Sequence, residues 1–331
     1  MAVRVAHMTL WSRFRESIGA RQHASCPAVL MYHRVAAVDR DPWGLCVSPE
    51  NFATQVERLR REREILPLDV FLRRGEEGRL SPRAVAITFD DGYRDNLTSA
   101  APVLARMDAP ATLFLATGPM RHQSAYWWDT VELAILDSEP VEGVLRIGSE
   151  DVAILLGPRE PADDARSDWR AWQPPRTARE CLYQRVWALL RALSPPAQAA
   201  AMTDLVALFR PRCEPLAGPM TDAEVRALIA GSPFTLGCHT VDHPDLSAVP
   251  VDVAYQQIMV GKADVEAIAG GRVTSFAYPY GSSSDAVEDL VRAAGFTHAC
   301  TTCALAFGGK PPLALPRRTA QDRPTIEWLD D

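Results

Sequence analysis

Short apolar runs alternate along the chain with longer stretches in which apolar residues recur at helical spacing. The candidate strands are the runs at 27–33, 84–89, 111–117, 234–238, 274–278, 297–302 and 312–316, each bounded by turn residues. Such alternation is typical of an α/β protein built on parallel strands. Seven runs favour a closed or nearly closed barrel.

Helix signals stand between these runs. A Ser-Pro pair at 48–49 supplies the cap and the first position of a helix that reaches Arg61. Thr221 and Glu224 form a capping box at the start of another helix. A helix over 251–269 ends at two glycines, which are typical stop signals. The strand and helix rhythm is therefore regular in both end regions of the chain.

The middle of the chain breaks this rhythm. It is rich in tryptophan and proline and carries helical patterns at about 126–137 and 178–210. Because the strand pattern resumes at Pro233, we interpret about 121–232 as a mostly helical insertion within one barrel domain over 29–318. Insertions at the ends of barrel strands usually shape the substrate site.

Composition is that of a folded protein with a small or neutral ligand. Among 331 residues, 47% are hydrophobic and 23% are charged, which is close to globular averages. The formal net charge is -7 and the sequence pI is about 5.6. A nucleic-acid partner is not expected, because no basic block exists to neutralise a row of phosphates.

We expect a helical segment at 1–28 before the barrel and a tail at 319–331 after it. Arg13, Arg15 and Glu16 interrupt the apolar core that a signal peptide needs. No stretch reaches the roughly 18 apolar residues of a membrane span, so a cytoplasmic location is expected. Apolar residues at helical spacing among the arginines leave peripheral contact with a membrane open, although docking on the protein body is favoured.

Two adjacent carboxylates, Asp90 and Asp91, stand in TFDDGY between an apolar strand and a glycine turn. Adjacent aspartates repel each other unless a cation or a proton separates them. One is therefore a candidate metal ligand and the other a candidate base. A solvated Asp-Gly turn is the ordinary alternative.

Two histidines, His239 and His243, directly follow the strand run FTLGC in GCHTVDHPDL. Their spacing of four predicts one face of a helical turn. Together with one carboxylate they would complete a three-ligand metal site with open positions for water. Histidine pairs also arise by chance on helix surfaces, but the Asp pair at another strand end makes chance the weaker explanation.

TFDDGY, HTVDH and then FAYPYG at 276–281 together resemble the polysaccharide deacetylase (NodB-homology) family of carbohydrate esterases. The opening VLMYHRV, followed by VSPENF, resembles members linked to exopolysaccharide assembly. The resemblance covers 29–120 and 233–318. It implies a distorted (β/α)7 TIM-like barrel and a metal-dependent hydrolase.

The resemblance implies a role for each matching residue. Asp90 corresponds to the general base, and Asp91, His239 and His243 correspond to the metal ligands. Zinc is the expected ion. The backbone N–H of Tyr280 corresponds to the donor that holds the oxyanion.

The first departure from the family pattern concerns the arginine that orients the base. Ala277 stands in its place. Arg317 or Arg318, just past the last strand run, is the candidate substitute, with Arg317 taken as the catalytic candidate. A plain pair of surface arginines is about equally compatible with the sequence.

The second departure concerns the histidine that protonates the leaving amine, which is absent near the C-terminus. Either His33, at the end of the first strand, or His298 could replace it if one lies within about 3 Å of the leaving nitrogen. His33 is favoured. For His298 a satisfied core histidine is the better interpretation.

Aromatic side chains near these motifs are the candidate substrate contacts. Tyr126, Trp127 and Trp128 precede Asp129 soon after the third strand. We take Trp128, with Tyr93 of TFDDGY, as the residues that contact a sugar. Aromatic runs of this kind more often seal an insertion onto a barrel.

The sequence therefore predicts metal-dependent removal of an N-acyl group, first of all N-acetyl, from an amino sugar, a glycoconjugate or a lipid-linked sugar. One alternative is a deformylase or another amidase that cleaves a non-sugar C–N bond. Another is a catalytically silent carbohydrate-binding relative.

Overall fold

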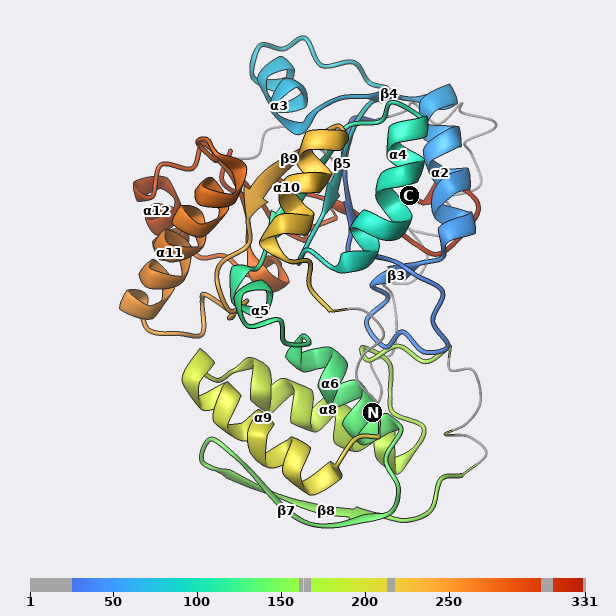
Figure 1. The fold of residues 1–331 in the computed structure, drawn as a ribbon, viewed down its shortest axis with the longest axis vertical. Coiled ribbons are helices and arrows are strands. Elements are labelled where there is room, and N and C mark those ends of the chain that lie inside the picture. Colours follow the sequence, from blue (N-terminus) through green and yellow to red (C-terminus); the bar gives the residue numbers. More distant parts are fainter. Residues whose placement is uncertain (1–25, 161–162, 164–167, 213–217, 305–311, 330–331) are drawn as a thin grey trace, which may run out of the picture.

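The computed structural model describes residues 26–160, 163, 168–212, 218–304 and 312–329. Most of the expected N-terminal helical segment, 1–28, lies outside these residues. The described chain forms a barrel body and a smaller lobe, the upper and lower parts of Figure 1. None of the described helices is long and apolar enough to cross a membrane.

Parallel strands form the inside of the barrel body. They are β1 (Ala28–Tyr32), β4 (Glu64–Ile65), β5 (Ala84–Phe89), β6 (Ala111–Leu115), β9 (Phe234–Cys238), β10 (Ser275–Ala277), β11 (His298–Cys300) and β12 (Arg318–Thr319). Their order is β11, β10, β9, β6, β5, β1, β12, and β4 pairs with the start of β5. The sheet curls into an open barrel, which confirms the predicted fold class. The first six predicted runs each contain one of these strands.

The seventh predicted strand, at 312–316, is wrong in position. Leu315 makes one isolated bridge to Cys300 of β11, whereas the strand that pairs with β1 is β12. Prolines at both ends of the run lack the backbone N–H that a strand ladder needs. The segment therefore passes from one edge of the sheet to the other and leaves Arg317 between the two contacts.

Helices cover the outside of the barrel. They are α2 (Pro49–Glu62), α3 (Leu68–Glu76), α4 (Ala101–Arg106), α5 (Thr117–His122), α10 (Asp222–Gly231), α11 (Val251–Ala269) and α12 (Asp285–Ala293). The predicted caps are present, since Ser48 accepts from the Asn51 N–H and Thr221 forms the capping box with Glu224. Short strands β2 (Arg34–Val35) and β3 (Cys46–Val47) bracket the loop that leads toward the lobe.

The lobe lies within the predicted insertion, about 121–232, whose last helix, α10, instead packs on the barrel. It contains α6 (Trp127–Leu136), β7 (Val141–Ile147), β8 (Glu150–Leu156), α8 (Ala178–Arg191) and α9 (Pro195–Phe209). The helical pattern predicted at 178–210 is two helices, because Pro195 starts a new one after the Ser194 cap. The antiparallel β7–β8 hairpin was not predicted, although its side chains alternate between buried and exposed.

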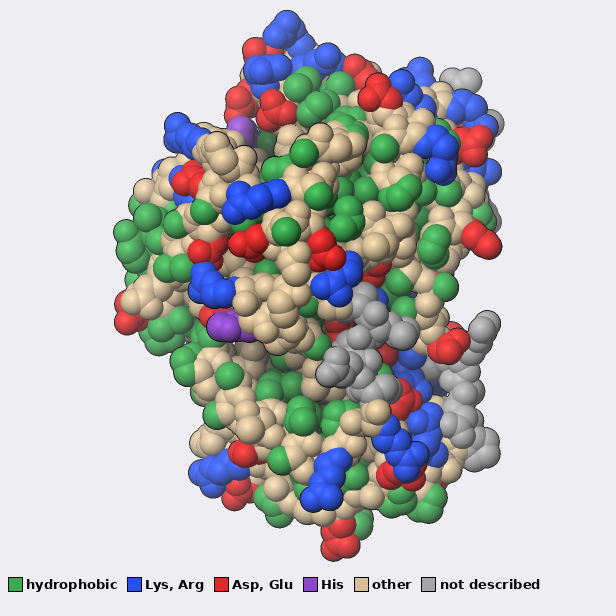
Figure 2. Space-filling view, in the orientation of Figure 1, with side chains coloured by type: hydrophobic (Ala, Val, Ile, Leu, Met, Phe, Trp, Pro, Cys, Tyr) green, Lys and Arg blue, Asp and Glu red, His purple; other side chains and the backbone are tan. Residues whose placement is uncertain are grey.

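The described residues form three hydrophobic clusters. The largest fills the space between the sheet and the barrel helices, and the smallest joins β1 and β5 to α3. The second lies within the lobe but includes Tyr93 of the barrel, with Tyr280 packed against it. On the face seen in Figure 2, basic and acidic side chains are interspersed over both parts. The lobe is therefore packed onto the carboxyl edge of the sheet, where strand ends bring loop residues together.

Candidate active site

Four strands deliver the candidate catalytic residues to one edge of the barrel. His33 follows β1, Asp90 and Asp91 follow β5, and His239 follows β9. Carboxyl ends of parallel strands converge at one edge, so the order along the chain becomes proximity in space. The segment after β10, which contains Tyr280, faces the same edge through its contact with His243, where the ring centroids lie 4.6 Å apart.

Asp90 is fixed by a buried arginine. Arg317 donates from Nη1 to Asp90 Oδ1 at 2.7 Å and from Nη2 to Oδ2 at 2.6 Å. The same guanidinium donates to the Thr88 hydroxyl and the Thr301 carbonyl. Burial alone would raise the pKa of Asp90, but Arg317, with His239, holds that pKa well below its usual range. The carboxylate is ionised and its orientation is set.

Between the two arginines that the sequence left open, the structure places Arg317 on Asp90. Arg317 is 1% exposed, whereas the neighbouring Arg318 is partly exposed in β12. Ala277, which stands where the family pattern has an arginine, is fully buried. Its carbonyl accepts a hydrogen bond from His239 Nδ1 at 2.7 Å. In this chain the arginine that binds the Asp90 carboxylate therefore comes from the segment before β12, and not from the position of Ala277.

Asp91, His239 and His243 form a group that can hold a metal ion. Their ligand atoms all lie within 4.8 Å of one another. Asp91 Oδ1 is 3.6 Å from His239 Nε2 and 3.5 Å from His243 Nε2. Because the Ala277 carbonyl can only accept, His239 carries its proton on Nδ1 and presents a lone pair at Nε2.

Orphaned polar atoms support this fit. Asp91 Oδ1 and His243 Nδ1 are buried without a hydrogen-bond partner in the described structure. Burial, with repulsion from Asp90 and Asp129, raises the pKa of Asp91 well above its usual value. Burial lowers the pKa of His239 and of His243. A carboxylate without a partner beside two neutral imidazoles is the donor set of a divalent ion.

The two histidines do not lie on a helix, contrary to the prediction from their spacing. They lie on the loop after β9, in which Thr240 has φ 70° and His243 has φ 56°. Asp91 and Tyr280 also have positive φ, at 72° and 58°. Four non-glycine residues in this strained region converge at one site, and strain of this kind concentrates at functional sites.

The two candidate acids are far apart. His33 Nε2 lies 4.0 Å from Asp90 Oδ2, and its side chain is 15% exposed. Burial lowers the pKa of His33 to about 4 against the opposing effect of Asp90. His298 begins β11 at the opposite, amino end of the strands, and its Nε2 lies 3.2 Å from Glu76 of α3. Of these two histidines, only His33 lies at the active-site edge.

The aromatic residues Tyr93, Tyr126 and Trp128 are all buried, and they differ in what they contact. Tyr93 is fully buried, so its side chain has no surface on which to contact a substrate, and the prediction of direct contact is corrected. Its hydroxyl donates to Asp129 and accepts from Trp128 Nε1. Tyr126 donates to the Asp91 carbonyl. Trp128 packs 4.8 Å from His243, between ring centroids, and also lines a neighbouring cavity.

An arginine of the lobe supports the site, a contact that the sequence does not predict. Arg191 of α8 donates from Nη2 to Asp245 Oδ2 at 2.7 Å, and its guanidinium carbon lies 4.4 Å from the centre of the Tyr280 ring. Asp245 follows His243 by two residues. One lobe arginine therefore contacts both loops that carry site residues, a relation for which the sequence offers no local signal.

Comparison with known proteins agrees with this geometry. The family model described as polysaccharide deacetylase matches residues 77–141 and 177–299, more than half of the chain. The putative polysaccharide deacetylase YxkH of Bacillus subtilis is 30% identical over 97 residues, which is 29% of this chain and 33% of that protein. The match thus spans about a third of the curated relative.

Two solved structures share the fold. The deacetylase PplD of Streptococcus pyogenes, in complex with acetate, has a TM-score of 0.57 and 16% identity, covering 89% of this chain and 92% of that one. IcaB from Ammonifex degensii has a TM-score of 0.53 and 17% identity, covering 93% and 98%. The family match extends over most of the barrel and much of the lobe, and the chain belongs to the polysaccharide deacetylase family.

Proposed function

We propose that the protein hydrolyses the amide of an N-acyl amino sugar, with N-acetyl as the first acyl group to test. The observation that carries this proposal is the pairing of a fixed, ionised Asp90 with an adjacent three-ligand group. Such a pairing supplies a base beside a Lewis-acid site, as amide hydrolysis requires.

Asp91, His239 and His243 would hold the divalent ion, for which zinc is our first choice. When bound, such an ion polarises an acyl carbonyl and lowers the pKa of water. The remaining work falls to side chains of this chain. Asp90, held by Arg317, accepts the proton of the attacking water through the carboxylate that Arg317 keeps ionised.

His33 is the proposed acid. Because its imidazole is neutral in the free protein, it must receive the proton that Asp90 has removed and pass it to the leaving nitrogen. The backbone N–H of Tyr280 is the proposed donor to the carbonyl oxygen as negative charge develops there. Each role is assigned to a residue at the same edge of the barrel.

The proposed substrate is a glycan or glycoconjugate, soluble or carried on a lipid. Support comes from the family and from Trp128, whose ring lies between His243 and the neighbouring cavity. Aromatic faces suit the apolar faces of sugar rings. A cytoplasmic location and contact of the N-terminal segment with a membrane are also proposals.

The test is acyl release, followed by mass, from a panel of N-acetyl and N-formyl sugars and their nucleotide conjugates. We expect Asp90→Asn to lower turnover by about 10²- to 10⁴-fold, the range of a lost general base. Asp252→Asn, on the exposed start of α11, is the matched control. Acetate or formate release that survives Asp90→Asn unchanged would overturn the proposal, as would metal binding without turnover of any panel member.

A further inference from the structure

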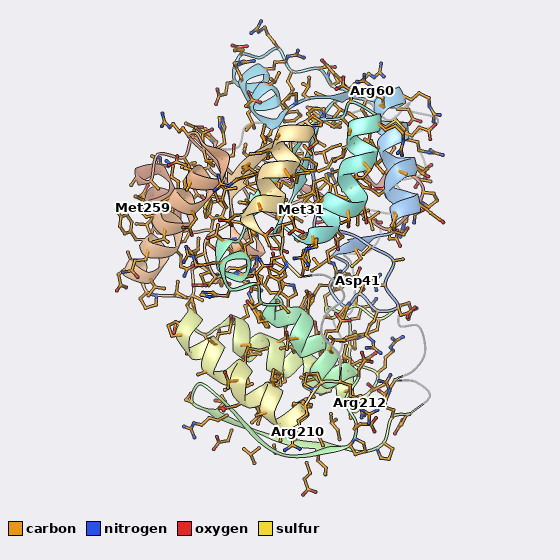
Figure 3. All side chains as sticks on the ribbon, in the orientation of Figure 1. Met31, Asp41, Arg60, Arg210, Arg212 and Met259 are labelled. Atoms are coloured by element: carbon orange, nitrogen blue, oxygen red, sulfur yellow. The ribbon has the colours of Figure 1, made fainter. Side chains whose placement is uncertain are left out.

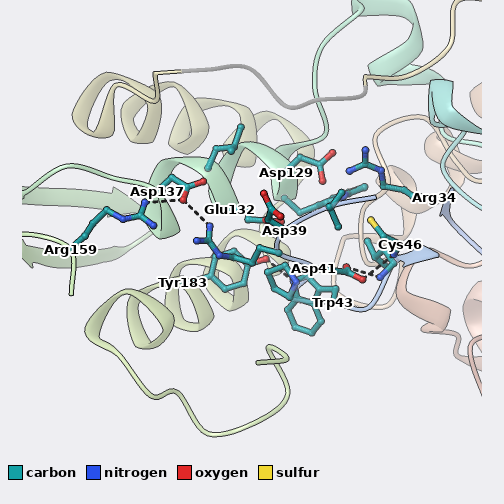
Figure 4. Close-up of a pocket in the computed structure, with 16 residues that line it drawn as sticks. Arg34, Asp39, Asp41, Trp43, Cys46, Asp129, Glu132, Asp137, Arg159 and Tyr183 are labelled. Atoms are coloured by element: carbon teal, nitrogen blue, oxygen red, sulfur yellow. Dashed lines mark hydrogen bonds and ion pairs between the residues drawn. The ribbon is translucent and has the colours of Figure 1, made fainter. Parts of the chain in front are cut away.

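A cavity of about 510 Å³ lies beside the active site, between the loop that joins β2 to β3 and helices α6 and α8 of the lobe. Figure 4 shows carboxylates from both sides pointing into it, with Trp43 and Tyr183 forming one wall. Figure 3 places Asp41 at the junction of barrel and lobe. Its volume is in the range of pockets that bind small organic ligands.

One side chain, Trp128, separates the cavity from the catalytic edge. Trp128 lines the cavity and packs against His243, a proposed metal ligand. Asp129 also lines it and accepts a hydrogen bond from Tyr93, three residues after Asp90. A substrate whose reacting group lies at the metal site could therefore place its neighbouring unit in the cavity.

The carboxyl groups of the cavity differ in how many hydrogen-bond partners they have. At its far end Asp137 accepts from both Arg40 and Arg159. Asp41 accepts from two backbone N–H groups of its own loop. Glu132 has no hydrogen-bond or ion-pair partner among the described residues.

The wall nearest the active site contains an arginine, and its ion-pair partner lies outside the cavity. Arg34, which lines the cavity there, is ion-paired with Asp95, which lies outside the lining. Burial raises the pKa of Asp129 to about 7 and that of Glu132 to about 8. Arg34 and Arg40 oppose these shifts from a distance, but neither Asp129 nor Glu132 forms an ion pair among the described residues.

A metal ion does not suit this wall. Asp91, His239 and His243 are the single group in the described part of the chain whose ligand atoms approach closely enough to share an ion. The cavity carboxylates are spread apart and interleaved with aromatic rings, so a cation with an extended organic body fits better. Trp43 and Tyr183, linked by a 2.9 Å hydrogen bond, offer a fixed aromatic wall to such a body.

We propose that this cavity binds the protonated amine of an amino sugar next to the N-acyl sugar in the same substrate, with Glu132 and Asp129 as the contacts, which release their protons to solvent when the amine binds. The enzyme would thus act preferentially on glycans that already carry a free amino group. This inference rests on the proposed function, because it assigns the neighbouring unit of the same substrate.

Binding is tested first, on the full chain at pH 7, by calorimetry with glucosamine, N-acetylglucosamine and calcium chloride as probes. We expect glucosamine to bind about tenfold or more tightly than N-acetylglucosamine, and Glu132→Gln to remove that difference. Glu142→Gln, on the exposed face of β7, is the control. Equal affinity of wild type and Glu132→Gln for glucosamine would overturn the inference, as would a response to calcium alone. Asp129→Asn serves as a second variant if Glu132→Gln does not fold.

Turnover is tested next, with a fully N-acetylated trisaccharide and its counterpart that carries one free amine. We expect kcat/KM to be about tenfold higher for the amine-bearing substrate, and the ratio to approach one in Glu132→Gln. Acetate release at equal rates from both substrates would refute the inference and leave the proposed function standing. Glutamate-dependent glucosamine binding with no acetate release would refute the proposed function instead.

Discussion

Two groups of carboxyl side chains lie close together in this molecule and are held in opposite ways. At the barrel edge, Asp90 receives two hydrogen bonds from Arg317, and Asp91 faces two imidazoles around a common centre. In the cavity of the lobe, Glu132 has no partner among the described residues, and Asp129 receives one hydroxyl hydrogen bond.

Burial acts on both groups, so the difference lies in their partners. The pKa of Asp90 lies well below its usual value because Arg317 outweighs burial, whereas burial raises that of Glu132 to about 8. The pKa of a buried carboxyl group is thus low at Asp90, where a guanidinium donates two hydrogen bonds to it, and raised at Glu132, where no such bond forms. The first arrangement suits catalysis, and the second suits a site that awaits a cationic ligand.

The largest effect should come from removing the metal ion that Asp91, His239 and His243 are proposed to hold. His243→Ala, or dialysis of wild type against a chelator, should lower turnover by about 10⁴-fold or more, since the Lewis-acid site is lost. Elemental analysis of the purified protein measures the bound ion directly. His122→Ala, an exposed histidine at the end of α5, should retain both metal and turnover. Full activity in metal-free protein would show that the carboxylates of the barrel edge do not serve a metal site, and their proposed difference from the carboxyl groups of the cavity would be lost.

A smaller effect is expected from the proposed acid. His33→Ala should reduce kcat by about 10²- to 10³-fold, within the range of general acid catalysis, and should change KM less. His298→Ala is the matched control, because His298 contacts Glu76 at the opposite end of the strands. Steady-state kinetics of the two variants decides the matter. Similar losses in both would assign the effect to folding rather than to proton transfer.

The role of Arg317, which donates two hydrogen bonds to Asp90, can be distinguished from that of the adjacent Arg318 by substitution. Arg317→Lys keeps the charge but loses the two parallel hydrogen bonds, and kcat should fall by about 10- to 100-fold. Arg318→Lys, in the partly exposed β12, should behave like wild type. If the two variants have equal kcat, then charge alone, and not bidentate geometry, maintains the base.

The barrel edge was readable in the sequence because its residues immediately follow buried strands. Asp90, Asp91 and His239 each come directly after an apolar run, and parallel strands align those ends. The local conformation was not readable. Positive φ at Thr240 and His243 places both imidazoles together without a helix, and spacing alone cannot distinguish these two geometries.

For the lobe, the sequence predicts the helices but neither the hairpin nor the contacts with the barrel. Its helices followed from their periodicity, but the β7–β8 hairpin turns at residues 148–149 and exposes Val144 and Leu155, which obscures the alternation of inward and outward residues. The contact of Arg191 with Asp245 joins residues 54 positions apart. Such contacts, like the cavity around Glu132, depend on how the lobe docks on the barrel, and no local pattern encodes that docking.

A modest effect is expected where the lobe supports the barrel edge. Arg191→Gln loses a charged hydrogen bond to Asp245 and the stacking on Tyr280, and kcat/KM should fall by about three- to tenfold. Arg185→Gln, an exposed arginine on the same helix, is the control. Kinetics and bound metal are measured for both. Unchanged kinetics in Arg191→Gln would mean that the two loops hold their shape without the lobe.

The smallest effect concerns stability and tests the cavity side of the comparison. Because the folded pKa of Glu132 is about 8 and its ordinary value is 4.5, the folded protein binds a proton that the unfolded chain has lost in this range. The contribution of Glu132 to the free energy of unfolding is therefore full below pH 4.5 and declines as pH rises toward 8. Glutamine cannot ionise, so the melting temperature of Glu132→Gln minus that of wild type should be larger at pH 9 than at pH 5. Melting curves at both pH values measure this shift, with Glu142→Gln as control. Parallel curves for wild type and Glu132→Gln would show that Glu132 is ionised in the folded protein, and the cavity would then resemble the paired site at the barrel edge.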